Sequence, residues 1–254
     1  MDNSVLYPWP HFLSMDCRKS RNSSYRSTDG NNFKYYDTIT GTTYTNNSVT
    51  SGIRYYYRVK AIATVDDTDW TSDLSAIKST VPVKTPTLSI AKSDGKVKLS
   101  WSAVTGASKY WIYRSTDGKS FKYYNATSGT TYTNSSVTSG VRYYYRVKAV
   151  TTINGVDWTG DLSAAKNTVP VATPKLSISK SSGKANLNWS AVTGASKYWV
   201  YRSTDGVNYS YYSTTSKTSY TVSVKSGTKY YYKVKAVATV DGSDWTGNLS
   251  NTVS

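Results

Sequence analysis

The sequence predicts an all-β protein made of tandem seven-stranded β-sandwiches, the first of which is truncated. One observation is the composition, because all 15 acidic residues are Asp and 25 Tyr accompany only 3 Phe. Long surface helices normally draw on Glu, whereas aromatic residues favour strands. A second is a repeat, since the segment Tyr-Arg-Ser-Thr-Asp-Gly begins at residues 25, 113 and 201, a spacing of 88 both times. A third is that short β-branched and aromatic segments alternate with turn residues.

The repeat and two proline-containing linkers divide the chain. Pro82 and Pro86 lie in the first linker and Pro170 and Pro174 in the second, and paired prolines favour an extended segment. We therefore expect a non-matching N-terminal segment at 1–24, followed by repeat one (25–83, truncated), repeat two (84–171) and repeat three (172–254), the last two being complete domains.

Repeat two carries the expected strands in order. They are residues 88–90, 97–101, 110–113, 121–124, 131–133 and 142–150, with a last strand entered through 157–163. Asp-Gly pairs at 29–30, 117–118 and 205–206 predict hairpin turns, because Gly tolerates positive φ. No stretch carries a helical period long enough to compete, and seven strands at this spacing predict a β-sandwich.

Three motifs of repeats two and three resemble fibronectin type III domains, of the kind found in tandem in secreted and surface proteins of bacteria. They are a Trp late in the second strand (Trp101, Trp189), Tyr-x-Ile/Val in the third (110–112, 198–200), and Gly-x-x-Tyr-x-Tyr-x-Val-x-Ala in the sixth (140–149, 227–236). The resemblance covers residues 86–254 fully and 25–85 in part. It implies an immunoglobulin-like sandwich with tyrosine corners at Tyr143 and Tyr230, and a spacer or binding role.

Repeat one departs from this pattern at its start. Residues 1–24 match neither the first two strands nor the third, and they contain no equivalent of Trp101, Tyr110 or Trp111. A sandwich without these parts exposes a sheet edge and part of its core. Either the chain is a fragment or misread start of a longer product, or residues 1–24 supply replacement strands. We favour the first explanation, because the segment has a different period and an odd composition.

The residues that carry most catalytic chemistry are nearly missing. His11 and Cys17 both lie in the first 24 positions, and no other His or Cys occurs. An imidazole or a thiolate is needed by cysteine or serine nucleophiles with a histidine base, by zinc sites, by haem and by iron-sulfur clusters. Asp157 and Asp161 suggest calcium, but Asn248 replaces Asp161 in repeat three, and a turn role is expected. We therefore expect no enzyme activity, no catalytic or metal-binding residues and no cofactor.

Most of the net charge of +16 belongs to the complete repeats, which carry +7 each. Residues 86–173 carry 11 basic and 4 acidic residues and 174–254 carry 10 and 3, whereas 1–85 carry 10 and 8. An even spread without a nucleic-acid stacking motif argues against a nucleic-acid partner. No run of 18 apolar residues occurs, so membrane insertion is not expected. Residues 1–24 also lack the basic start of a signal peptide.

The candidate site is the outward face of one sheet. Period-two alternation places Tyr143, Tyr145, Val147 and Ala149 of the sixth strand toward the core, with Tyr110 and Ile112 of the third. The ten candidate ligand-binding residues are Trp111, Tyr113, Tyr144, Arg146 and Trp158 in repeat two, and Trp199, Tyr201, Tyr231, Lys233 and Trp245 in repeat three. Aromatic rings with cationic neighbours suit sugar stacking and anionic polymers. The plainer interpretation is that these side chains cover and stabilise a solvated sheet.

The expected function is a non-catalytic, extracellular or cell-surface spacer or interaction array from a bacterial surface or secreted protein. The alternative is a carbohydrate or cell-wall polymer binding module that uses the aromatic and basic face. The expected partners are accordingly a cell-wall or plant polysaccharide or another surface protein, and the chain itself is expected to be monomeric. The sequence names neither the ligand nor the parent protein.

Overall fold

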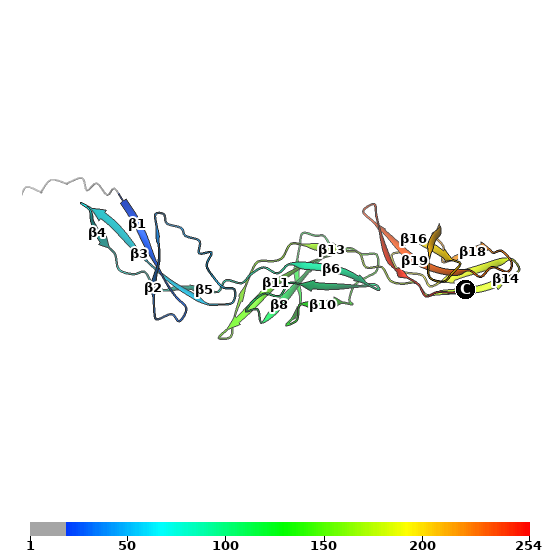
Figure 1. The fold of residues 1–254 in the computed structure, drawn as a ribbon, viewed down its shortest axis with the longest axis horizontal. Coiled ribbons are helices and arrows are strands. Elements are labelled where there is room, and N and C mark those ends of the chain that lie inside the picture. The colour runs from blue at the N-terminus through cyan, green and yellow to red at the C-terminus, as the bar shows by residue number, and fades with distance from the viewer. Residues whose placement is uncertain (1–18) are drawn as a thin grey trace, which may run out of the picture. The chain divides into compact units, whose positions relative to one another are not determined.

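The computed structural model describes residues 19–254, with Lys19 and Ser20 described by their backbone alone. Every regular element in this range is a β-strand (Figure 1). The chain divides into two compact units, Met1–Pro82 and Val83–Ser254, so repeats two and three belong to one unit. Residues 1–18 lie outside the described residues, and they include His11 and Cys17. The two explanations offered for residues 1–24 concern mainly these positions.

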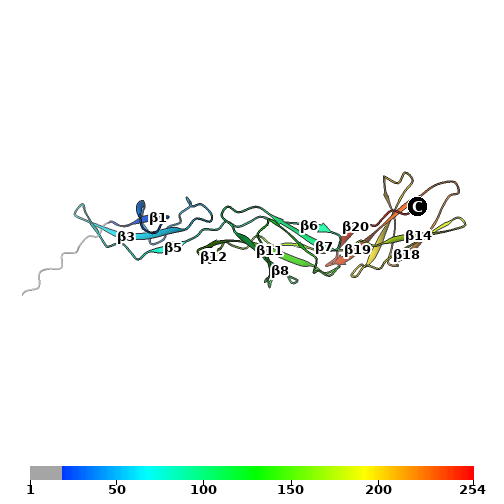
Figure 2. The same ribbon diagram turned by 90° about the horizontal axis from the view of Figure 1, so that it is seen from below.

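Repeat two is a two-layered sandwich. One sheet has the strand order β10-β7-β6 and the other β12-β11-β8-β9, with β13 also paired to β11. The first sheet consists of β6 (Leu88–Ser93), β7 (Lys96–Trp101) and β10 (Thr131–Asn134), of which β6 and β7 lie side by side in Figure 2. The second consists of β8 (Lys109–Ser115), β9 (Lys122–Thr127), β11 (Tyr143–Ile153), β12 (Val156–Thr159) and β13 (Lys166–Thr168).

The last strand of repeat two is interrupted where the sequence predicts a single strand. Between β12 and β13 the chain stays beside β11, since Gly160 and Ser163 donate backbone N–H groups to the carbonyls of Ala149 and Val147 at 3.2 and 2.8 Å. The Ser163 hydroxyl accepts the Val147 N–H at 3.0 Å. A side chain therefore replaces one rung of the ladder, and this divides the strand.

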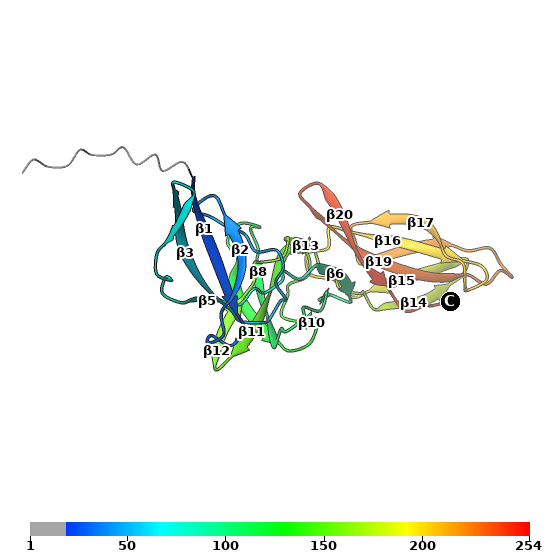
Figure 3. The ribbon, with the colours of Figure 1, turned by 60° about the vertical axis from the view of Figure 1, so that its left-hand side comes forward.

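Repeat three follows the same plan (Figure 3). Its first sheet has the order β14-β15-β18 and its second β17-β16-β19-β20. The strands are β14 (Leu176–Ser181), β15 (Lys184–Trp189), β18 (Ser219–Ser223), β16 (Lys197–Ser203), β17 (Ser210–Thr215), β19 (Tyr231–Val240) and β20 (Ser243–Leu249). The fold class predicted from the sequence, tandem β-sandwiches, is confirmed.

The core lies between the two sheets, where the alternation in the sequence places it. Ile112, Tyr145, Val147 and Ala149 have no exposed surface. Trp101 packs on Tyr110 with ring centroids 5.5 Å apart. Burying apolar side chains of this size stabilises a fold by about 1.5–3 kcal/mol each, so this layer holds the two sheets together.

The expected tyrosine corner forms in repeat two. The Tyr143 hydroxyl accepts the backbone N–H of Thr138 at 2.9 Å. Tyr55 of repeat one makes the same bond with Thr50 at 2.9 Å. Tyr230 has no such bond in the described part of repeat three, although an arginine lies over its ring as over Tyr143, with the Arg202 guanidinium carbon 4.9 Å from the ring centroid.

Repeat one is a single sheet of the order β2-β1-β3-β4, with β5 paired to β3. Its strands are β1 (Lys19–Ser27), β2 (Lys34–Ile39), β3 (Tyr55–Val65), β4 (Thr68–Thr71) and β5 (Lys78–Thr80). β1 takes the place of the third strand and runs across the boundary expected at residue 24. Asn22 and Ser24 stand where repeat two has Tyr110 and Ile112, so this strand contributes little apolar surface to a core.

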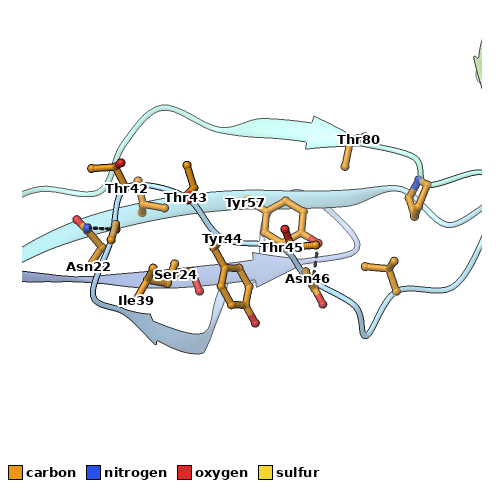
Figure 4. A pocket seen from close by; sticks show the side chains of 14 residues that line it. Asn22, Ser24, Ile39, Thr42, Thr43, Tyr44, Thr45, Asn46, Tyr57 and Thr80 are labelled. Atoms are coloured by element: carbon orange, nitrogen blue, oxygen red, sulfur yellow. Dashed lines mark hydrogen bonds between the residues drawn. The ribbon is translucent and has the colours of Figure 1, made fainter.

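The inner face of repeat one is open, because residues 19–82 include no second sheet. Val59 is 45% exposed, whereas its equivalent Val147 is fully buried. The resulting hollow has a volume of about 630 Å³. Tyr44 and Tyr57 are among the residues that line it (Figure 4). Asn46 donates a hydrogen bond to the Tyr57 hydroxyl at 2.9 Å, which keeps this ring in its place (Figure 4).

Candidate functional site

The outward face of repeat two carries three aromatic rings on β8 and β9. Trp111 and Tyr113 lie on β8, and Tyr123 of β9 stands against both. Its ring is nearly perpendicular to Trp111 (6.3 Å, 89°) and to Tyr113 (6.1 Å, 86°). These are the edge-to-face contacts that aromatic pairs prefer. The rings of Trp111, Tyr113 and Tyr123 therefore do not form the flat platform that sugar stacking favours. We call this perpendicular arrangement a herringbone cluster.

The same arrangement recurs in repeat three. Tyr211 of β17 stands against Trp199 (6.4 Å, 88°) and Tyr201 (6.2 Å, 86°) of β16. Tyr123 and Tyr211 are the most exposed members of these clusters, at 58% and 57%. The sequence reasoning missed both residues. The Tyr123–Tyr124 and Tyr211–Tyr212 pairs could have indicated them, because one of two successive residues in a strand must face outward.

Cationic side chains lie near the rings of this face. Lys109 Nζ is 6.0 Å from the Trp111 ring centroid, and the Arg146 guanidinium carbon is 4.8 Å from that of Phe121. In repeat three, Lys233 Nζ is 4.4 Å from the Tyr209 ring and Lys235 Nζ 5.6 Å from the Tyr201 ring. Cation-π contacts at exposed sites are worth about 0.5–1 kcal/mol each. They occupy ring faces that a stacked sugar would need.

Tyr144 of β11 and Tyr231 of β19 pack on turns and not on the herringbone clusters. A methyl group at Gly118 would lie 3.0 Å from the Tyr144 ring, and one at Gly206 would lie 3.3 Å from the Tyr231 ring. Both glycines have positive φ, 74° and 78°. The tyrosines thus pack directly on the Asp-Gly turns, which explains why glycine is needed there.

Each Asp-Gly turn is fixed by its own aspartate. Asp117 Oδ1 accepts the Ser115 hydroxyl at 2.6 Å and the backbone N–H groups of Lys119 and Ser120 at 2.8 Å. These bonds, led by that of Ser115, hold the pKa of Asp117 well below its ordinary value. Asp29 and Asp205 make the same contacts. The pockets beside the turns of repeats one and two are therefore lined by carboxylates already engaged in local structure.

Trp158 and Trp245 lie on the opposite face of the sheet from Trp111 and Trp199, which corrects their grouping into one site. Cross-strand partners share a face. Trp245 pairs with the fully buried Ala238, whereas Trp199 pairs with Lys235. Trp158 pairs with Thr151, which is 4% exposed. Neither tryptophan covers the herringbone clusters.

Trp245 takes part in the contact between repeats two and three. Its ring centroid lies 5.4 Å from the Arg142 guanidinium carbon and 5.7 Å from Lys92 Nζ, both of repeat two. Arg142 also donates to the Val240 carbonyl at 3.4 Å and pairs with Asp241 at 3.4 Å. Lys92 donates to the Thr246 carbonyl at 3.4 Å. We call this set of contacts the joint.

The joint also brings the two backbones together. A methyl group at Gly140 would lie 2.7 Å from Gly194 Cα, and one at Gly95 would lie 3.2 Å from the Ala172 methyl group. The Thr173 N–H donates to Asp94 Oδ1 at 3.1 Å. Glycine permits this approach because it has no side chain. No local pattern in the sequence identified the joint, since its parts lie far apart in the chain.

The described residues assemble no metal site. Residues 19–254 contain no group of three or more His, Cys, Asp or Glu side chains that could hold an ion. Asp157 pairs with Lys109 at 2.7 Å and accepts the Thr152 hydroxyl at 2.6 Å. Its partner Lys109 is the main cause of its lowered pKa. No helix in the described range is long and apolar enough to cross a membrane.

Comparison with known proteins adds structural likenesses only. No protein-family model and no curated protein matches the sequence. One similar solved structure is the FN1–FN3 domains of chicken CNTN1, at 17% identity over 93% of this chain and 88% of that chain, with a TM-score of 0.32. Another is the chicken interferon gamma receptor alpha chain, at 13% identity over 67% and 97%, with a TM-score of 0.44. The strand order of repeats two and three is itself that of a fibronectin type III-like sandwich.

Proposed function

We propose that the chain is a non-catalytic extracellular spacer array of fibronectin type III-like domains, from a bacterial surface or secreted protein. The observation that carries this proposal is the joint. A spacer must hold successive domains at a defined angle, and a short linker with few contacts would leave that angle free. Trp245, Arg142 and Asp241 provide contacts that the linker alone does not.

The experiment compares the orientation of repeats two and three in solution. Residual dipolar couplings of the full chain should fit one alignment tensor for both repeats. Trp245→Ala should leave two tensors that differ, because the ring between Lys92 and Arg142 is lost. Trp199→Ala is the matched control, since it removes an outward tryptophan away from the joint, and it should keep one tensor. Two independent tensors in the unaltered chain would refute the spacer proposal.

A second candidate function is binding of a carbohydrate or cell-wall polymer at the herringbone clusters. The observation in its favour is the exposure of Tyr123 and Tyr211 beside basic side chains. Against it stand the perpendicular rings and the cations that already cover ring faces. Such a module would serve a surface protein equally well, so the two functions are compatible in one chain.

The test is co-sedimentation of the full chain with insoluble cell-wall and plant polysaccharides over a salt series. A Trp111→Ala/Trp199→Ala double variant is measured alongside. Binding that survives high salt and disappears in the variant would establish a carbohydrate module, because stacking is not screened by ions. Pelleting that fades with salt equally in both proteins would show generic positive charge only.

A further inference from the structure

The tip of the β11–β12 hairpin in repeat two carries the pair Asn154–Gly155. Both residues are exposed, and both have positive φ, 52° and 78°. Asn-Gly suits a two-residue hairpin turn, because both residues tolerate this conformation. In the same pair a backbone nitrogen can also attack a side-chain amide, since glycine carries no side chain that would obstruct the approach. A methyl group added at Gly155 would meet nothing within 4 Å, so this side of the turn is open.

Three of the five Asp-Gly pairs in the chain are protected against such an attack by a serine. In the turns at 29–30, 117–118 and 205–206 a serine hydroxyl accepts the glycine N–H at 3.1, 3.0 and 2.9 Å. The nitrogen that would attack is therefore already engaged. The pKa values of the three aspartates are also held below the ordinary 3.8, so their side chains are carboxylates. A carboxylate repels a nucleophile more than a neutral amide does, because it is negatively charged.

The other two Asp-Gly pairs make contacts across the joint. Asp94 Oδ1 accepts the Thr173 N–H at 3.1 Å, and Asp241 pairs with Arg142 at 3.4 Å. Asn154 differs from all of these aspartates, because its side chain makes no hydrogen bond or ion pair within residues 19–254. The N–H of the following glycine has no partner in that range either. Among the described pairs of Asp or Asn followed by Gly, this pair alone therefore has both reacting groups free.

We propose that Asn154 is a site of spontaneous deamidation, which gives repeat two a carboxylate at the tip of its hairpin. The Gly155 backbone nitrogen loses its proton and attacks Asn154 Cγ, so that a new C–N bond closes a succinimide ring. The Cγ–Nδ2 bond breaks, and the side-chain nitrogen leaves as ammonia with that proton. Water then opens the ring, adding a hydroxyl to one carbonyl carbon and a proton to the ring nitrogen. Opening at Cγ gives aspartate, and opening at the main-chain carbonyl gives isoaspartate.

The two products act differently on the hairpin. Aspartate fits the turn, because Asp241 occupies the equivalent position of repeat three with φ 49°. Isoaspartate carries the main chain through its Cβ, so it adds one atom to a turn whose ends are the paired residues Ile153 and Val156. It should therefore weaken the pairing of β12 with β11. This inference goes beyond the proposed spacer function and does not depend on it.

The test follows the full chain in its native state by peptide mass spectrometry. The chain is kept at neutral and at mildly alkaline pH, and it is then digested briefly with trypsin at mildly acid pH. Trypsin cleaves after Lys and Arg, so Asn154 falls in the peptide 149–166. This peptide should gain the mass difference between an acid and an amide. The gain should be faster at the higher pH, because the Gly155 nitrogen must lose a proton.

The peptide 35–54 is an internal control, because it contains Asn47, which is also exposed. The residue after Asn47 has a side chain, and its nitrogen is engaged, since the Ser48 N–H donates to Asn46 Oδ1 at 2.9 Å. This peptide should keep its mass while 149–166 changes. The variant Asn154→Gln keeps an amide but would have to close a larger ring, so its peptide 149–166 should keep its mass too.

The same chain unfolded in urea shows how fast the pair reacts without its turn. Conversion in the native chain should lie within about tenfold of this rate, because the exposed tip of a hairpin opens at little cost. The variant Asn154→Asp identifies the products, since its peptide should co-elute with one of the two. Slower conversion in the native chain would overturn the proposal, because the turn would then protect Asn154. So would equal conversion of 35–54 and 149–166, or conversion of 149–166 in Asn154→Gln.

Discussion

Two equivalent tyrosines in the cores of repeats two and three should respond differently to the same substitution. The Tyr145 hydroxyl accepts a hydrogen bond from Asn134 Nδ2 at 2.8 Å, and both residues are fully buried. Tyr232 stands at the same position in repeat three, but Val222 replaces the asparagine, and the Tyr232 hydroxyl is buried without a partner. Tyr145→Phe therefore leaves the buried Asn134 amide N–H without an acceptor. Tyr232→Phe removes a hydroxyl that already has no partner.

The magnitudes follow from this difference. A buried donor left without its acceptor costs about 1–3 kcal/mol, so Tyr145→Phe should lower the free energy of unfolding of repeat two by that amount. Tyr232→Phe should change that of repeat three by less than about 0.5 kcal/mol or raise it, because desolvating an unpaired hydroxyl is itself unfavourable. The two variants remove the same atom from the same strand position, so each is the control of the other.

Amide hydrogen exchange followed by mass spectrometry can measure both repeats within one chain. Exchange of amides in β11 should speed up about fivefold to thirtyfold in Tyr145→Phe for a loss of about 1–2 kcal/mol. Exchange in β19 should be unchanged or slower in Tyr232→Phe. Equal acceleration in the two variants would refute the reasoning, since it would mean that packing of the hydroxyl and not its hydrogen bond carries the stability.

Three further predictions concern turns and pH. Gly118→Ala should lower the free energy of urea unfolding more than Gly183→Ala does. Both glycines have positive φ, which costs an alanine about 1–2 kcal/mol, but only the methyl group at 118 also presses on the Tyr144 ring. The pKa of Asp117 is held below its ordinary value of 3.8, chiefly by the Ser115 hydroxyl. The Asp117 carboxylate should therefore contribute fully to stability above about pH 4, and this contribution should be lost on acidification. In thermal melts, the Asp117→Asn variant should lose less stability at acid pH than the unaltered chain does. Burial raises the pKa of Tyr145 to about 12. The melting temperature should therefore hold below pH 10 and fall between pH 10 and 12, because this tyrosine ionises first in the unfolded chain. A melting temperature that stays constant across this interval would contradict the raised pKa.

The sequence by itself determined the local features. The repeat of 88 residues, the strand segments and their turns follow from composition and period, and the inward positions of Ile112, Tyr145 and Val147 follow from alternation. These features depend on neighbours along the chain, whose geometry is the same wherever the segment lies. The interruption between β12 and β13 did not follow, because the hydroxyl of Ser163 replaces a rung that only the folded sheet presents.

Only the tertiary structure decided how the aromatic residues are grouped. Tyr123 stands across Trp111 and Tyr113 because β9 pairs with β8 in one register, and a shift of that register would have separated them. Trp245 leaves the outward face and reaches Arg142, about a hundred residues earlier in the chain. Contacts of this kind depend on which strands and domains become neighbours, and no period in the sequence encodes the distance between Trp245 and Arg142.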